Sequence, residues 1–362
     1  MTIGYVLHPY EESHASGMGY SMLEVCKQLA ASHGPHQFCI YATRPVDRKV
    51  VPGSYESIVM PKGILRQFFY FMFQCRADVL LFTAPLLPLW LPSRIKAMVL
   101  CKELGSQKLR PGRLADRAIA FVRDHVLMPR TLEHAAAIAA SSEATKADIL
   151  RYYRVAPEKV TVIPEGYQDW KLYAGVPEHT WEDAKPFFFF TGKVKPRKNV
   201  HGIVTAFIEY KEKTKSDAHL MIAGDYGGDY HRSMVEMLEA CGLGKYVHFL
   251  GYVSAEEMHW LYANARVFVF PSLNEGFGMP LVEAMSFGVP TITSLNSPMA
   301  DIADGGSLLV DPADTSDMAK AMERLFSDES LRTRLIQKGR EQSALYSWDR
   351  TGASYRALLA RL

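Results

Sequence analysis

The sequence predicts an α/β protein built from two doubly wound domains. Short apolar runs alternate with longer amphipathic segments, a pattern typical of a parallel sheet with helices on both faces. The alternation is clearest between Phe187–Phe190 and Val267–Phe270. The length of 362 residues also exceeds one ordinary hydrophobic core, because single domains cluster at roughly 100–200 residues. We therefore expect about two domains.

The strands can be placed in order along the chain. A strand is expected at Ile3–Leu7, a helix at Ser21–Ala31 and a second strand at Phe38–Ala42. In the second half, at least five strands of one sheet are expected, at Phe187–Phe190, Leu220–Ala223, Val247–Leu250, Val267–Phe270 and Thr291–Thr293.

Two helices of the second half have recognisable starts. Apolar residues recur on one helical face from Val200 to Ile208, and Asn199 suits the N-cap of that helix. Ser254, followed three residues later by Glu257, predicts a capping box that satisfies two backbone amides reciprocally. This second helix is expected to run to about Asn264.

A domain boundary is indicated by the polar, irregular stretch Gln168–Lys185, which contains Gly175 and Pro177. We expect a first domain over residues 1–170 and a second over 171–345. The pattern of the tail is helical, so residues 346–362 are expected to form a helix that returns to the first domain.

Composition narrows the class of protein. With 48% hydrophobic and 22% charged residues, the chain is an ordinary globular protein. Its 41 basic and 39 acidic residues give a net charge of +2. A protein that wraps nucleic acid is expected to be strongly basic. Residues 1–170 carry 20 basic and 15 acidic residues, against 21 and 24 in the remainder. The basic first half favours a partner that is anionic or lies at a membrane.

The five cysteines are odd in number and include no CxxC pair, so they are expected to be buried thiols of a reducing cytoplasm. The most membrane-like stretch, Val79–Pro92, is interrupted by prolines and falls short of the ~20 residues of a spanning helix. No transmembrane segment is expected.

The most specific motif is the loop from Glu275 to Glu283, which follows a buried strand and opens a helix. Gly276 and Gly278 allow a backbone to approach a ligand, and Pro280 suits a first helical turn. Amides near Met279, Leu281 and Val282 would then form an anion site suited to a diphosphate. The two carboxylates could grip vicinal hydroxyls of a sugar and a ribose. The alternative is a tight turn with acids that merely favour a helix N-terminus.

A second cluster, Thr191–Asn199, also lies between a strand and a helix and contains Lys193, Lys195, Arg197 and Lys198. Lys193 and Lys198 flank Pro196, so both ammonium groups are expected to converge on one diphosphate. The alternative is a solvated charged face. A third loop at this edge, Gly224–Gly228, is interpreted as a turn.

Together with Phe249–Val253 and Val267–Ser272, these two motifs resemble the C-terminal domain of retaining glycosyltransferase family 4. The likeness extends over nearly the whole chain through four further stretches, Ser141–Lys146, Val160–Gly166, Leu308–Pro312 and Tyr346–Trp348. It implies the GT-B fold, in which two Rossmann-like domains face each other across a cleft.

The resemblance also implies roles for single residues. Glu283 would hold the nucleotide ribose, Glu275 the donor sugar, and Lys198 the diphosphate, with Lys193 as a second phosphate cation. Glu275, Lys198 and Lys193 are thus the candidate catalytic residues. The implied donor-binding residues are Gly17, Gly19, Lys193, Arg197, Lys198, Tyr252, Val253, Glu275, Gly276, Phe277, Gly278, Met279, Leu281 and Glu283. Within this set, the backbone at Tyr252 and Val253 would meet the base.

One departure concerns the first domain. Where the family often has His-Asp, with the histidine near the donor sugar, this chain has Lys102-Glu103. Lys102 is therefore the candidate active-site partner from this domain. It could donate to the sugar or a phosphate, pair with Glu103, or lie on the surface.

The function expected from the resemblance is retaining transfer of a hexose, first of all mannose from GDP-mannose, to a saccharide or lipid-linked saccharide. The Pro196–Asn199 sequence resembles members that use that donor. UDP-hexoses are the alternative, as is a non-catalytic nucleotide-sugar binding protein; an epimerase or a phosphorylase explains the glycine loop less well. No metal or other cofactor is expected, because no DxD dyad or metal-ligand spacing is visible.

A cytoplasmic location follows from the cysteines, with peripheral contact at the inner face of a membrane as a hypothesis. It rests on the aromatic-rich helix expected around Phe68–Phe73, which Lys62, Arg66 and Arg76 flank. The alternative is that this helix is buried core.

Overall fold

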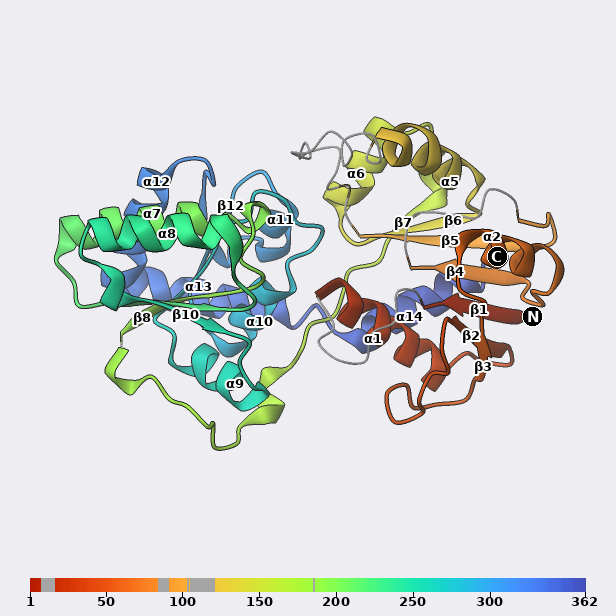
Figure 1. The fold of residues 1–362 in the computed structure, drawn as a ribbon, viewed down its shortest axis with the longest axis horizontal. Helices are drawn as coiled ribbons and strands as arrows, with labels where there is room; N and C mark the ends of the chain where they lie inside the picture. Colours follow the sequence, from red (N-terminus) through yellow and green to blue (C-terminus); the bar gives the residue numbers. More distant parts are fainter. Residues whose placement is uncertain (8–16, 84–90, 103, 105–120, 185) are drawn as a thin grey trace. The chain divides into compact units, whose positions relative to one another are not determined.

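The computed structural model describes residues 1–7, 17–83, 91–102, 104, 121–184 and 186–362 (Figure 1). The chain forms two compact units. The first consists of residues 1–166 and 347–362, and the second of residues 167–346. The chain thus crosses between units at 166/167 and 346/347, close to the positions 170 and 345 expected from the sequence.

The first unit contains a sheet whose described strands are all parallel and pair in the order β3-β2-β1-β4-β5-β6-β7. The strands are β1 (Thr2–Val6), β2 (Gln37–Ala42), β3 (Glu56–Val59), β4 (Val79–Phe82), β5 (Lys96–Cys101), β6 (Ala137–Ala140) and β7 (Val160–Val162). The central strands are buried on both faces, so they read as continuous apolar runs.

Helices cover both faces of this sheet. They are α1 (Gly17–Ala31), α2 (Ile64–Phe73), α5 (Met128–His134), α6 (Glu143–Tyr152) and α14 (Trp348–Leu359). The face with Tyr5 packs against α1 and α14, and the opposite face packs against α2, α5 and α6. The helix α14, from the blue end of the chain, therefore lies beside the red α1 in Figure 1. The tail returns to the first domain, as expected.

The second unit has a parallel sheet in the order β10-β9-β8-β11-β12-β13. Its strands are β8 (Phe187–Thr191), β9 (His219–Ala223), β10 (Val247–Gly251), β11 (Val267–Phe270), β12 (Thr291–Ser294) and β13 (Ser307–Val310). The five expected strands are all present. The sixth, β13, is an edge strand in which Leu308 is partly buried and Leu309 is exposed, so its burial pattern is broken.

Four consecutive phenylalanines hold the centre of the second unit. Phe188 packs edge-on against Phe207 of α7 on one face, whereas Phe189 packs against Tyr262 of α9 on the other. This alternation follows from the two-residue period of a strand. The helices of the unit are α7 (Val200–Thr214), α8 (Gly228–Ala240), α9 (Ala255–Asn264), α10 (Met279–Phe287), α11 (Pro298–Ala303), α12 (Thr315–Ser327) and α13 (Glu329–Ser343).

The two expected helix caps have different outcomes. Ser254 and Glu257 form the capping box, and α9 ends at Asn264, so that prediction is confirmed. Asn199 occupies the N-cap position of α7 but its side chain does not cap. Its backbone is left-handed, with φ 58°, and Nδ2 instead donates to the carbonyls of Pro271 and Pro312 at 3.1 and 2.7 Å. The expected cap fails because the amide side chain is used to tie two other loops to this corner.

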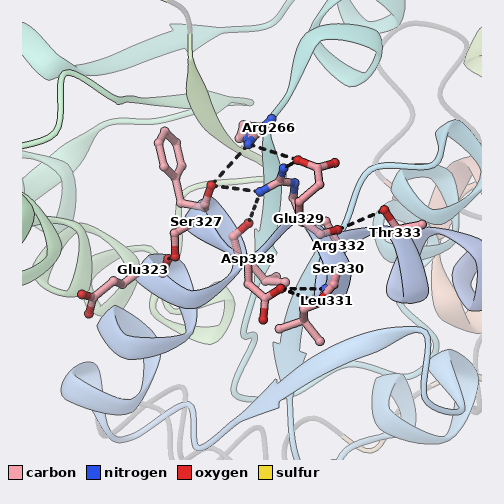
Figure 2. A network of polar contacts seen from close by, with 11 residues as sticks. Arg266, Glu323, Ser327, Asp328, Glu329, Ser330, Leu331, Arg332 and Thr333 are labelled. Carbon is pink, nitrogen blue, oxygen red and sulfur yellow. Dashed lines mark hydrogen bonds and ion pairs between the residues drawn. The ribbon is translucent and has the colours of Figure 1, made fainter.

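A polar network at the junction of α12 and α13 joins this end of the unit to the strand β11 (Figure 2). The buried Arg332 donates to the carbonyls of Leu325 and Phe326 at 3.2 and 3.0 Å and pairs with Glu329. Arg266, just before β11, donates to the same Phe326 carbonyl at 3.4 Å. The network caps helix ends at the amino edge of the sheet.

The aromatic helix α2 has a buried and an exposed side. Phe71 is part of the core under the first sheet, whereas Phe69 and Phe73 are 57% and 74% exposed, with ring centroids 6.3 Å apart. Among the helices that the structure describes, none combines the length and the hydropathy that crossing a bilayer requires. Of the five cysteines, four are buried as expected, but Cys241 is exposed.

Candidate active site

The predicted site of the second unit lies at the carboxyl ends of β8, β9, β10 and β11. The strand β8 lies between β9 and β11, where the chain reverses the direction in which it adds strands, and ligands of doubly wound sheets bind at such a point. The loops after β8, β9 and β10 meet there through backbone contacts. Gly192 N donates to Ala223 O at 2.9 Å and Gly224 N to Gly251 O at 2.7 Å.

Glycine is required where these loops meet. Gly224 has φ 128°, and a Cβ atom there would lie 2.3 Å from the carbonyl oxygen of Gly192. No side chain can occupy that space, since the neighbouring atom is backbone. The close approach brings Asp225, the next residue, over the loop that follows β8.

The glycine loop before α10 also has the expected local form. Gly278 is the N-cap with φ 97°, and a Cβ atom at this position would lie 2.8 Å from Cγ of Met299. Pro280 lies in the first turn. One expectation is wrong: the amide of Leu281 donates to Gly278 O at 2.9 Å, so it is not directed outward to an anion.

Glu275 forms ion pairs with two cations from the loop after β8. Lys198 Nζ lies 2.5 Å from Glu275 Oε1, and Arg197 Nη1 lies 3.6 Å from Oε2. The side chains of Lys198 and Glu275 are only 14% and 9% exposed, and the ammonium group also lies 4.9 Å from the ring centroid of Phe270. Arg197 further donates to Asn274 O at 3.2 Å. The predicted cation corner and the predicted carboxylate are thus one structural unit.

Lys193 has a different partner. Its Nζ lies 2.6 Å from Asp225 Oδ2, and the two side chains are 52% and 38% exposed. The hydrogen bond and the charge of Asp225 raise the pKa of Lys193. Lys193 and Lys198 therefore do not converge on a shared group in this structure. The local pattern predicts only a turn role for Asp225, although its place just after a central strand is a signal for a site residue.

Glu283 is buried on α10. Tyr262 Oη donates to its Oε2 at 2.8 Å. Burial raises the pKa of Glu283 to about 7, against the opposing contacts with Trp170, Tyr262 and the backbone of Gln168. Tyr262 and Trp170 were not expected near this carboxylate, because their positions on α9 and in the linker give no local signal.

The other predicted residues of this unit frame the loop. Phe277 is buried and packs edge-on against Tyr346 at 5.3 Å, so its role here is to anchor the loop. Gly276 is buried, and Met279 is partly buried against the core. Tyr252 and Val253 follow β10, the first exposed and the second partly buried.

In the first unit, Gly17 and Gly19 form the first turn of α1. Lys102 follows β5 and is not on the surface: its Nζ lies 2.9 Å from Glu165 Oε1 and donates to Ser21 Oγ of α1. A pair between Lys102 and Glu103 lies outside the described residues. Glu165 was not predicted as a site residue, because it lies 63 positions further along the chain.

Two parallel-sheet, Rossmann-like units, with a cation corner at the carboxyl edge of the second, define the class of GT-B fold proteins. Residues 176–342 match the family model of glycosyl transferases group 1. The fold agrees with solved structures of low sequence identity. Sucrose-phosphate synthase from Thermosynechococcus elongatus has a TM-score of 0.76 at 19% identity, over 100% of both chains. HepE from Anabaena, in complex with UDP and glucose, has a TM-score of 0.76 at 14% identity, also over 100% of both chains.

Several curated relatives are named as mannosyltransferases. O-antigen chain mannosyltransferase B from Escherichia coli is 31% identical over 163 residues, which are 45% of this chain and 42% of that protein. Four further relatives at 25–29% identity are also named as mannosyltransferases. The chain spans between 27% and 58% of the length of these five proteins.

Proposed function

We propose that this protein is a retaining glycosyltransferase that moves mannose from GDP-mannose to a saccharide or lipid-linked saccharide in surface glycan biosynthesis. The observation that carries the proposal is the unit of Lys198, Arg197 and Glu275 at the carboxyl edge of the second sheet. Two cations held beside a carboxylate and a glycine loop suit a ligand with a diphosphate on one side and sugar hydroxyls on the other.

The chemistry of transfer explains why such cations are useful. The bond between the anomeric carbon and the β-phosphate oxygen breaks, and an acceptor hydroxyl oxygen forms a bond to the same carbon. The hydroxyl proton passes to the leaving phosphate. We propose that the acceptor hydroxyl attacks and the phosphate departs on the same face of the sugar. Lys198 and Lys193 would stabilise the negative charge that develops on the diphosphate. We propose that these cations suffice without a metal, so a chelator should leave turnover unchanged.

Mannose and guanosine are supported by two observations. The sequence Pro196–Asn199 resembles members of the family that use GDP-mannose, and five curated relatives are named as mannosyltransferases. The UDP and glucose bound to Anabaena HepE support a UDP-hexose as the alternative donor. A cytoplasmic site of action is part of the proposal, since nucleotide sugars would meet the enzyme there.

The proposal is tested by a donor panel read as release of free nucleoside diphosphate. GDP-mannose, GDP-fucose, UDP-glucose and UDP-galactose are incubated with the protein, with and without a lipid-linked saccharide acceptor. We expect release from GDP-mannose above the others, with slow hydrolysis in the absence of acceptor. Faster release from a UDP-hexose would mean that the donor is a UDP-hexose and not GDP-mannose. Binding of GDP-mannose without release under any condition would favour a non-catalytic binding protein.

Peripheral membrane contact is a second element of the proposal. Phe69 and Phe73 project from α2, and Lys62, Arg66 and Arg76 around this helix are exposed. Exposed aromatics rimmed by cations suit an anionic lipid surface. The test is co-sedimentation with vesicles of phosphatidylglycerol and phosphatidylcholine, where the double variant Phe69→Ser/Phe73→Ser should lose binding.

A matched control for this test is Leu172→Ser, which removes an equally exposed apolar side chain from the second unit. It should bind vesicles as the unmodified protein does. If the unmodified protein stays in the supernatant with anionic vesicles, the membrane contact is wrong.

A further inference from the structure

The first unit contains a buried ion pair that the fold does not require. Lys102 and Glu165 are 13% and 11% exposed at the side chain, and the distance between Nζ and Oε1 is 2.9 Å. Lys102 directly follows β5, and Glu165 lies beyond β7, so both lie at the carboxyl edge of the first sheet. The backbone of Lys102 is itself fixed, because Ser141 Oγ donates to its carbonyl at 2.6 Å.

A contribution to folding stability is a poor explanation for an ion pair in this position. Removing two charges from water costs several kcal/mol per ion, and apolar residues of similar volume are often at least as stable. The adjoining cores of the sheet are apolar and continuous. The edge where the pair lies is also where parallel sheets bind ligands, and Lys102 Nζ donates to Ser21 Oγ of α1 at this edge.

We propose that Glu165 is a positioning residue that holds the Lys102 ammonium group charged and in place to bind a phosphate group of a substrate. The inference rests on the proposed function, in which both the nucleotide donor and a lipid-linked acceptor carry phosphate. Lys102 is the group that contacts the phosphate, and Glu165 acts only through Lys102. The bond to Ser21 fixes the direction of the ammonium group.

The charged state of Lys102 depends on this pairing. Burial lowers the pKa of Lys102, and the charge and hydrogen bond of Glu165 raise it again. Three other titratable groups face Glu165 or its surroundings: Tyr5 on β1, Tyr355 on α14 and Cys26 on α1. Burial raises the pKa of all three, so they stay neutral in the physiological range. Among the described residues, Glu165 is then the charge that keeps Lys102 protonated.

The first experiment follows the Lys102 signal by NMR in protein labelled at the lysine ε-carbon, assigned by its loss in Lys102→Met. In Glu165→Gln, we expect Lys102 to lose its proton at lower pH than in the unmodified protein. Inorganic pyrophosphate should shift this signal in the unmodified protein. In Glu165→Gln, pyrophosphate should shift the signal only at acidic pH. Glu24→Gln is the matched control, because it neutralises the partner of Lys27 in an ion pair of 2.6 Å on α1.

The second experiment is a double-mutant cycle on turnover. Lys102→Met should raise the KM of a phosphate-bearing substrate about ten-fold or more, as expected for loss of a charged hydrogen bond. In Glu165→Gln, the same KM should rise as the pH increases, and kcat should change little. The double variant should be no worse than Lys102→Met alone. An effect on hydrolysis of GDP-mannose without acceptor assigns the phosphate to the donor, and an effect on transfer alone assigns it to the acceptor.

The outcomes separate this inference from the function on which it rests. Additive losses in the cycle, or a Lys102 signal that pyrophosphate does not shift, would overturn the role of the pair even in an active enzyme. If no donor releases nucleoside diphosphate with the unmodified protein, the proposed function is wrong. The pyrophosphate shift and its dependence on Glu165 would still decide whether Lys102 binds phosphate.

Discussion

Lys198 and Lys193 lie on the same loop, and each is paired with one carboxylate, yet only the first pair is shielded from water. Lys198 is held against Glu275 and the ring of Phe270, whereas the side chains of Lys193 and Asp225 are 52% and 38% exposed. Because solvent screens exposed pairs, the Lys193 pair should matter little to stability and be easily exchanged for a ligand. The comparison separates a fixed part of the candidate site from an adjustable one.

The largest effect is expected at the fixed pair. Glu275→Ala removes the carboxylate that holds both Lys198 and Arg197, and we expect transfer to fall about 100-fold or more. Circular dichroism should show that the variant keeps its fold, and Glu275→Gln, which keeps the volume, should be impaired as well. Near-normal turnover by Glu275→Ala would mean that the shielded pair is not part of the active site.

The next effect concerns Lys198 itself. Lys198→Ala should weaken binding of GDP about ten-fold or more, since a hydrogen bond to a charged group contributes about 1.5–3 kcal/mol. Calorimetry measures this directly. Lys195→Ala is the matched control, because Lys195 is an exposed lysine of the same loop, and its affinity for GDP should equal that of the unmodified protein. Equal losses in both variants would indicate only the general charge of the loop.

Glu283 provides a test of burial at the other end of the glycine loop. Its pKa is raised to about 7 in the folded protein, so the folded state holds a proton that the unfolded chain releases at lower pH. The stability from this group is complete below about pH 4.5 and is lost as the pH rises to about 7. Relative to Glu283→Gln, the free energy of unfolding should fall by about 3 kcal/mol over this range.

Urea unfolding of both proteins between pH 4 and 8 measures the difference. A parallel dependence on pH in the two proteins would show that Glu283 does not titrate in this range.

The smallest effect is expected at the exposed pair. Asp225→Asn removes the carboxylate that competes with a nucleotide phosphate for Lys193. The affinity for GDP should therefore rise, by no more than about three-fold at low salt. The gain should vanish at high ionic strength, where exposed charges are screened. A loss of affinity would instead show that Asp225 helps to bind the nucleotide, and the contrast between the two lysines would then disappear.

The sequence was sufficient for the fold because the relevant signals are local. Apolar runs such as Phe187–Phe190 and the capping box at Ser254 depend on near neighbours, and both appear as expected. The glycine at 278 also has the conformation that the motif requires. Such features can be recognised without any knowledge of which segments meet.

The partners of the charged residues could not be predicted in the same way. Lys193 and Lys198 look equivalent in sequence, but Asp225 comes from the loop after β9 and Glu275 from the loop after β11. Lys102 likewise pairs with Glu165 from beyond β7. Asn199, which suits a cap by local rules, is used by two distant carbonyls. Pairings of this kind depend on sheet order, which the local pattern does not specify.

The return of α14 to the first unit affects how the protein can assemble. Gly166 packs so tightly on Trp348 that a Cβ atom would lie 2.4 Å from its backbone nitrogen, and Thr351 donates to Pro164 O at 2.8 Å. During synthesis, residues 167–346 form a continuous segment that can fold while residues 1–166 still lack one of their covering helices. The ribosome must therefore finish the later unit before the earlier one can close its core.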